Sequence, residues 1–290
     1  MRSVFLPQTL NELWQILQEE PRSALYAGGT DLLVRMRNGL IHPNQMICLE
    51  RIEELTGVED RGEEIFIGPC TTLTKLLESP LVMNHFPILI SGLKVLGSPP
   101  IRNMGTIGGN IVTASPAGDS LPPLYALRAE LELRRRDSSR RVPIREFFKG
   151  PGETILKPGE VLTALWLRKC PEFNLHHYEK VGQRKALAIA IVSLAALLKI
   201  SEGGMVEEVR LAWGSVAPTI VTSAEIEAML IGNRLSRQVL EKAAPLARAM
   251  VRPIDDIRAG ADYRRLVAGN LLLRLDTYRR NSENPFLTFS

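Results

Sequence analysis

The sequence predicts an α+β fold divided into two domains, and three patterns along its 290 residues support this prediction. A short strand, a double-glycine turn and a short helix follow one another between residues 24 and 39, as in an α/β unit. Residues 129–135 alternate apolar and charged side chains, which is typical of a strand with one buried face. The last third contains two strand patterns followed by three helical stretches, which indicates a second, smaller domain.

The N-terminal third is predicted to form a small unit of helices and strands. Thr9 is placed to cap a helix whose apolar residues recur at helical spacing, and Pro21 ends that helix. Strands are expected at residues 24–27 and 46–49, with a short helix beginning at Leu32. These elements are enough for one sheet with helices beside it.

The middle of the chain is richer in strands. In chain order we expect a strand at 65–68, a helix at 81–96 broken by Pro87, a hairpin of 129–135 with 141–144 that turns at 137–139, and a strand at 161–167. This segment therefore continues the first domain with a second sheet.

The pattern of predicted strands and helices changes after residue 172, and this change predicts a domain boundary. Strands at 189–200 and 206–213 surround a glycine turn, and helices begin near Ser223, Ser236 and Ala261. We therefore predict a first domain at 1–172, with parts at about 1–55 and 56–172, and a C-terminal domain at 173–290.

Charge and hydropathy exclude several classes of protein. The net charge is +4 and acidic residues are interleaved with the basic ones, so no contiguous basic surface for nucleic acid is expected. The N-terminus lacks a sustained apolar segment, which predicts a cytoplasmic location. The longest apolar stretch, at 187–198, is shorter than the roughly 20 residues of a membrane helix, so no membrane span is predicted.

The cysteines and histidines form no metal-binding pattern. Cys48, Cys70 and Cys170 are far apart and are expected to be buried thiols. The histidines have no zinc-ligand spacing, and the adjacent pair at 176–177 would point to opposite faces of a strand. No metal site is predicted on this chain.

Two double-glycine turns are the most informative motifs. Residues 26–31 contain Gly28 and Gly29, and residues 105–110 contain Gly108 and Gly109. Successive backbone N–H groups without a Cβ form a nest for an anion such as phosphate, and two nests that face one ligand indicate a pyrophosphate. Neither turn is a P-loop or a Rossmann fingerprint. Taken alone, each pair could equally be a tight turn.

The residues around the glycines resemble a known family. Residues 27–33, residues 105–119, and Tyr178-Glu179-Lys180 followed by Arg184 and residues 188–190 resemble, in this order, the FAD-binding subunit of the molybdenum hydroxylases. The likeness covers essentially the whole chain. It implies a two-part FAD-binding domain of the vanillyl-alcohol-oxidase (PCMH) type followed by a smaller α/β domain with an antiparallel sheet and helices.

The resemblance also implies a set of cofactor-binding residues. On one side of the pyrophosphate it places Ala27, Gly28, Gly29, Thr30, Asp31 and Leu32, and on the other Thr106, Gly108, Gly109, Asn110 and Thr113. It assigns Asp119 to the adenosine portion, Val161 and Leu162 to the surroundings of the adenine, and Lys180 to the flavin. It assigns no covalent or acid–base catalytic residue to this chain.

Physical reasoning tests these assignments separately. Backbone amides suit a pyrophosphate because they are fixed dipoles, whereas the Asp119 carboxylate would repel phosphate and fits a sugar hydroxyl better. Without the resemblance, Asp119 is expected to cap a turn or helix before Leu121. Lys180 would be an ordinary strand lysine facing solvent. Near a flavin, its charge would favour reduction.

The function that follows is electron transfer within a larger complex. Two iron-sulfur clusters need about eight thiolates, more than the three cysteines of this chain, so the clusters and the molybdopterin are expected on an iron-sulfur subunit and a large subunit. FAD would pass electrons to an acceptor such as NAD or a quinone. The alternative is a self-sufficient flavin reductase of the nucleotide-sugar type, for which no convincing proton donor is found.

A run of arginines lies in the predicted hairpin. Arg134, Arg135, Arg136, Arg140 and Arg141 could attract an anionic acceptor or a partner subunit. Strand alternation places these charges on both faces, which favours a solvated hairpin tip. Arg184 is expected to position its loop.

Overall fold

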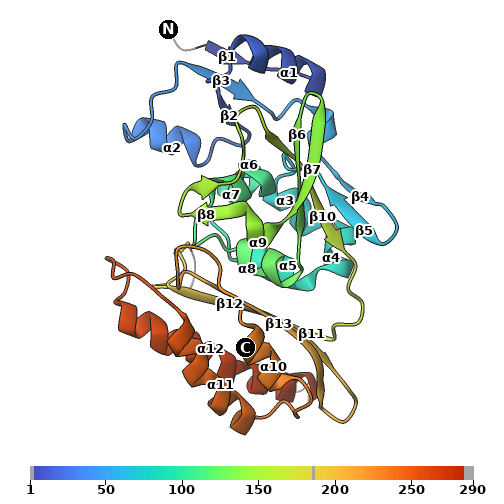
Figure 1. Cartoon of the computed structure of the whole chain (residues 1–290), viewed down its shortest axis with the longest axis vertical. Coiled ribbons are helices and arrows are strands. Elements are labelled where there is room, and N and C mark those ends of the chain that lie inside the picture. Colours follow the sequence, from blue (N-terminus) through green and yellow to red (C-terminus); the bar gives the residue numbers. More distant parts are fainter. Residues whose placement is uncertain (1–2, 185–186, 284–290) are drawn as a thin grey trace. The chain divides into compact units, whose positions relative to one another are not determined.

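The computed structural model describes residues 3–184 and 187–283. The chain forms two compact units, shown in Figure 1. The first comprises the residues up to Phe86, Gly97–Ser115 and Arg128–Lys169, and the second comprises Pro87–Leu96, Pro116–Leu127 and the residues from Cys170 onward. Two short segments from the first half of the chain therefore belong to the second unit. The division at residue 172 stays a prediction.

The first unit begins with a small parallel sheet. Strands β1 (Ser3–Phe5) and β2 (Ala24–Tyr26) both pair with β3 (Gln45–Cys48), in the order β1-β3-β2. Helix α1 (Leu10–Glu19) is capped by the Thr9 side chain and buries Leu13 and Trp14, and α2 (Leu32–Arg37) follows the first glycine segment. The α/β unit predicted for this third is confirmed.

The first unit also contains a five-stranded antiparallel sheet. Its order is β4 (Val58–Asp60), β5 (Glu64–Ile67), β10 (Val161–Arg168), β6 (Glu130–Arg135) and β7 (Ser138–Pro143). The remaining elements are η1 (Glu53–Leu55), α3 (Leu73–Glu78), α4 (Pro80–His85), α6 (Pro99–Met104), α7 (Ile107–Thr113), α9 (Ile144–Phe147), β8 (Phe148–Gly150) and β9 (Glu153–Thr154).

The β6–β7 hairpin is tighter than predicted. Arg135 pairs with Ser138 and Arg134 pairs with Ser139, so only Arg136 and Asp137 form the turn. The turn predicted at 137–139 is therefore wrong, because Ser138 and Ser139 belong to the paired strand β7. Two-residue turns match the twist of paired strands best, which favours this tighter connection.

The second unit is a sheet between two layers of helices. Strands β11 (Leu175–Val181), β12 (Val192–Ile200) and β13 (Val206–Gly214) are antiparallel, with β12 in the centre. Helices α10 (Ala224–Leu230), α11 (Arg237–Met250) and α12 (Ala261–Glu283) follow, and Figure 1 shows α11 and α12 side by side along one face. Helices α5 (Pro87–Lys94) and α8 (Leu121–Ala126) contact the sheet from the other side.

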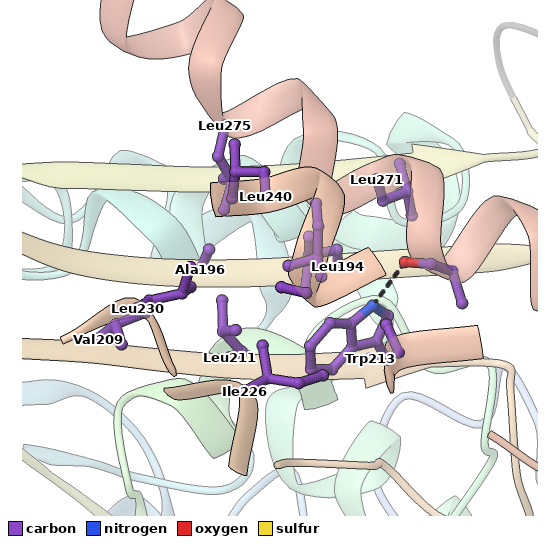
Figure 2. Close-up of a cluster of buried hydrophobic side chains, with 14 of the residues drawn as sticks. Leu194, Ala196, Val209, Leu211, Trp213, Ile226, Leu230, Leu240, Leu271 and Leu275 are labelled. Carbon is purple, nitrogen blue, oxygen red and sulfur yellow. Dashed lines mark hydrogen bonds between the residues drawn. The ribbon is translucent and has the colours of Figure 1, made fainter. Parts of the chain in front are cut away.

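The core of the second unit is built around Trp213. Its ring is fully buried among leucines of the strands and of α11 and α12, as Figure 2 shows, and its Nε1–H donates to the Ala268 carbonyl at 3.1 Å. This bond joins the sheet to α12. It also satisfies the polar atom of a buried indole, which would otherwise destabilise the core.

We expect Trp213→Phe to lower the free energy of unfolding by about 2 kcal/mol, because it leaves a cavity and removes the bond to Ala268. Urea denaturation measures the change. Trp166→Phe is the matched control, since Trp166 is only half-buried on β10, and a smaller loss is expected there. Equal losses for the two variants would contradict this account of the core.

The cysteines are buried thiols, as predicted. Cys48, Cys70 and Cys170 are each less than one tenth exposed, and burial raises the pKa of Cys70 to about 12. No helix in the described residues is long and apolar enough to cross a membrane.

Candidate functional site

The two glycine segments lie against each other in the first unit. A Cβ built on Gly28 would overlap the Met104 carbonyl, and one built on Gly105 would lie 3.3 Å from Thr30 Oγ1. Backbones approach this closely only where a side chain is missing. The two motifs, far apart in the sequence, therefore lie in direct contact.

The first glycine segment presents free backbone amides. The N–H groups of residues 28–31 donate to no other residue in the part of the chain that the structure describes. Gly29 has a φ of 66°, a left-handed conformation that favours glycine. The next turn is closed, because Leu33 N donates to Gly29 O at 3.1 Å and starts α2. Successive free amides in such a loop make a nest for an anion.

The second glycine segment differs from the prediction. It forms the first turn of α7, capped by Thr106, and its amides already have acceptors. Ile107 N donates to Thr71 O at 3.1 Å, Gly108 N to Pro69 O at 2.8 Å, and Gly109 N to Thr106 Oγ1 at 3.1 Å. The expectation that this turn offers free amides is therefore wrong.

Close packing explains the second pair of glycines better. A Cβ on Gly108 would overlap Pro69, whose carbonyl oxygen would lie only 2.7 Å away. Gly108 is buried and Gly109 is exposed. Gly108 thus permits the close approach of the backbone around Pro69 to the first turn of α7.

Thr106→Ala removes the cap of α7, and we expect it to cost about 1 kcal/mol of folding free energy, because Gly109 N–H then loses its acceptor. Thr106→Ser retains the oxygen and is expected to keep most of the stability. Chemical denaturation of both variants measures the difference, and equal stability of the alanine and serine variants would contradict the capping role.

The other site residues predicted in the first unit have different surroundings. Asp31 is exposed, with its carboxylate 3.9 Å from Arg35, and Ala27 and Leu32 are half-buried. Asn110 and Thr113 are half-buried on α7. Val161 and Leu162 are 3% and 4% exposed, and Val161 packs into a core with Leu13. The contacts predicted for these residues stay predictions.

The second unit contains a buried ion pair. Lys180 Nζ lies 2.6 Å from Asp119 Oδ2, and the side chains are 9% and 8% exposed. The Tyr178 hydroxyl donates to Asp119 Oδ1 at 3.0 Å, and Lys180 Nζ also donates to Val95 O at 2.9 Å. Asp119 precedes α8, whereas Tyr178 and Lys180 lie two residues apart on one face of β11. The three groups form a closed polar cluster.

Two expectations based on the residues alone, apart from the family resemblance, are wrong. Lys180 does not face solvent, and no capping bond from Asp119 is found among the described residues. Burial raises the pKa of the Asp119 carboxyl, although the Lys180 charge opposes this shift. Burial also raises the pKa of Tyr178 well above its usual value, so its hydroxyl stays protonated and donates. Sequence reasoning gave Tyr178 no role of its own, although strand alternation places it beside Lys180.

The hairpin arginines are largely engaged within the first unit. Arg140 forms a bidentate salt bridge with Glu160, with both N···O distances at 2.9 Å. Arg141 Nη1 lies 3.0 Å from Glu64 Oε2, and its guanidinium carbon lies 4.0 Å from the centroid of the Trp166 ring. These contacts disfavour the hairpin as an anion site. In the second unit, Arg184 donates to Leu187 O at 2.7 Å, within its own loop.

The described residues contain no group of three or more histidine, cysteine or acidic side chains that could hold a metal ion. The first unit thus offers the free backbone amides of residues 28–31, next to the close contact of Gly28 with Met104. The second unit offers the buried ion pair of Asp119 and Lys180.

Comparison with known proteins identifies the family. Residues 1–167 match the FAD binding domain in molybdopterin dehydrogenase, and residues 177–277 match the CO dehydrogenase flavoprotein C-terminal domain. The carbon monoxide dehydrogenase medium chain of Hydrogenophaga pseudoflava is 31% identical, over 92% of this chain and 93% of that protein. The xanthine dehydrogenase FAD-binding subunit of Escherichia coli O157:H7 is also 31% identical, over 88% of each chain.

A solved structure shows the same fold. Quinoline 2-oxidoreductase from Pseudomonas putida 86 superposes with a TM-score of 0.91 at 26% identity, over 97% of this chain and 98% of the matched chain. The predicted α+β fold, with a PCMH-type FAD domain and a smaller C-terminal domain, is confirmed. The chain belongs to the FAD-binding flavoproteins of the molybdopterin dehydrogenase family, and its cofactor is FAD.

Proposed function

We propose that this chain is the electron-transfer subunit of a molybdenum hydroxylase complex, in which it holds the FAD. It is an FAD-dependent oxidoreductase subunit by family, since both of its domains match flavoprotein domains. The observation that carries the proposal is the nest of free amides at residues 28–31, held against Met104 by the Gly28 contact.

The residues of the nest fit a pyrophosphate. Backbone amides bind its negative charge without requiring a counter-ion, and the Thr30 hydroxyl adds a side-chain donor next to them. The second glycine segment supports this nest by packing against it. In this proposal, the side chains of Asn110 and Thr113 add hydrogen-bond donors for the pyrophosphate. A bound FAD supplies redox chemistry that no side chain of this protein provides.

The proposal includes partner subunits. The relatives are called a medium chain and an FAD-binding subunit, names for parts of larger enzymes. With three cysteines, this chain has too few thiolates for two iron-sulfur clusters. We therefore place the clusters on an iron-sulfur subunit and the molybdopterin on a large subunit, with NAD or a quinone as electron acceptor. The cytoplasmic location remains part of this proposal.

Affinity purification of the tagged chain from its own cells tests the proposal. We expect it to bring down two further chains, one carrying iron and sulfide and the other carrying molybdopterin. Substrate oxidation is expected only when all three are present. A lone chain that oxidises substrate and reduces its acceptor at the full rate would contradict the proposal and favour a self-sufficient flavin reductase.

A further inference from the structure

We propose that Glu50 binds FAD directly, by accepting a hydrogen bond from a sugar hydroxyl next to the pyrophosphate. This inference rests on the proposed function, in which the free amides of residues 28–31 bind that pyrophosphate. It uses residues of the first unit alone, since the nest and Glu50 both lie before Phe86. The family resemblance gives Glu50 no role.

The parallel sheet places Glu50 at the same edge as the nest. Strands β2 and β3 are neighbours, Tyr26 pairs with Cys48, and Leu49 N donates to Tyr26 O at 2.8 Å. The nest begins two residues after Tyr26, and Glu50 follows Cys48 by the same two residues. Because neighbouring strands lie about 4.8 Å apart, both groups leave the carboxyl end of the sheet close together.

Side-chain contacts turn the Glu50 carboxylate back towards the strand ends. Cys48 Sγ donates to Glu50 Oε2 at 3.7 Å. Burial raises the pKa of Tyr26, and a hydrogen bond with Cys48 and the charge of Glu50 raise it further. The Tyr26 ring in turn lies 3.8 Å from the position of a Cβ built on Gly29. A continuous set of side chains thus connects the carboxylate with the nest.

The carboxylate of Glu50 has room for a ligand. Glu50 is exposed, and apart from the weak bond to the thiol its oxygens have no partner in the part of the chain that the structure describes. Asp119, in contrast, has a partner on each oxygen. A carboxylate accepts hydrogen bonds and repels phosphate, so beside a pyrophosphate it suits a hydroxyl.

Other dinucleotide sites combine a glycine turn and a carboxylate in a similar way. In α/β folds that bind dinucleotides, an acidic residue about 20 residues after the glycine turn hydrogen-bonds a ribose hydroxyl. Glu50 follows Gly29 by 21 residues and lies just beyond the next parallel strand. The turn itself is no Rossmann fingerprint, so the likeness lies in the order and spacing of nest, strand and carboxylate.

Fluorescence titration of the FAD-free full chain with FAD measures the contribution of Glu50. We expect Glu50→Gln to weaken FAD binding about tenfold, because the hydrogen bond to a charged acceptor becomes one to a neutral amide. Glu63→Gln is the matched control, since Glu63 is also exposed in the same unit but lies between β4 and β5, in the other sheet. It should bind FAD as the parent does.

Competition with ADP and its deoxyribose analogues identifies the hydroxyl. If Glu50 binds the adenosine ribose, Glu50→Gln weakens ADP binding as well, and an analogue that lacks the contacted hydroxyl binds the parent and the variant alike. If Glu50 binds the ribityl chain, Glu50→Gln weakens the binding of FAD but leaves that of ADP unchanged. Either result supports the inference and assigns the sugar.

Unchanged or tighter FAD binding in Glu50→Gln would overturn the inference, because a carboxylate that contacts no hydroxyl can only repel the phosphates. An equal loss in Glu63→Gln would overturn it too, as would a loss of ADP affinity that is the same for every deoxy analogue. Circular dichroism checks that each variant folds. A parent chain that binds no FAD overturns the proposed function, whereas parent-like binding by Glu50→Gln overturns this inference alone.

Discussion

Gly28→Ala is expected to weaken FAD binding on the order of 100-fold and to lower the free energy of unfolding by about 3 kcal/mol. The added methyl group would overlap the Met104 carbonyl, which is backbone and cannot rotate away. The two glycine segments must then separate, and the free amides of residues 28–31 lose the support of the segment that leads into α7.

Gly150→Ala is the matched control for this variant. Gly150 lies on β8 in the same unit, and the nearest atom to an added Cβ is Glu153 Oε2, at 3.8 Å. It should bind FAD as the parent does. Flavin fluorescence titration and urea denaturation measure both effects, and parent-like FAD affinity in Gly28→Ala would show that the contact between the two segments is not needed for the site.

Arg264→Met is expected to cost about 3 to 5 kcal/mol of folding free energy, because it breaks a buried network. The Arg264 side chain is 4% exposed and donates to Ile191 O at 2.7 Å, to Ser215 O at 3.0 Å and to Asp256 Oδ1 at 2.8 Å. One guanidinium thus connects α12 with the start of β12 and the end of β13. Without it, buried polar atoms lose their partner.

The neighbouring Arg265 provides the control. Its side chain is 41% exposed and pairs with the fully exposed Asp262, so Arg265→Met should cost less than about 1 kcal/mol. The two substitutions are chemically identical and adjacent on one helix. Thermal and urea unfolding compare them directly, and equal costs would mean that the contacts of Arg264 contribute no more than a surface ion pair.

Capping residues, prolines and helical periodicity correctly predicted where several helices begin and end. Thr9 caps α1 as expected, and Pro87 separates α4 from α5. The helices expected near Ser223, Ser236 and Ala261 begin within one residue of those positions. Capping and helical periodicity act over a few residues, which is why single-sequence reasoning captured them.

Long-range contacts account for what the sequence did not reveal. The amides of the second glycine segment are occupied by carbonyls of Pro69 and Thr71, which belong to a separate segment. The ion pair joins Asp119 to a lysine 61 residues later in the chain. Burial of such a pair depends on the packing of α5 and α8 against the sheet, which no local pattern encodes. Lys180 consequently resembled an ordinary surface lysine.

The visible absorption spectrum of the purified full chain tests the central claim most directly. After saturation with FAD and removal of the excess, we expect flavin bands corresponding to a single bound FAD per chain, with Gly150→Ala unchanged and Gly28→Ala largely colourless. A parent chain that folds, as shown by circular dichroism, but stays colourless after this treatment would contradict the assignment of the glycine segments to FAD.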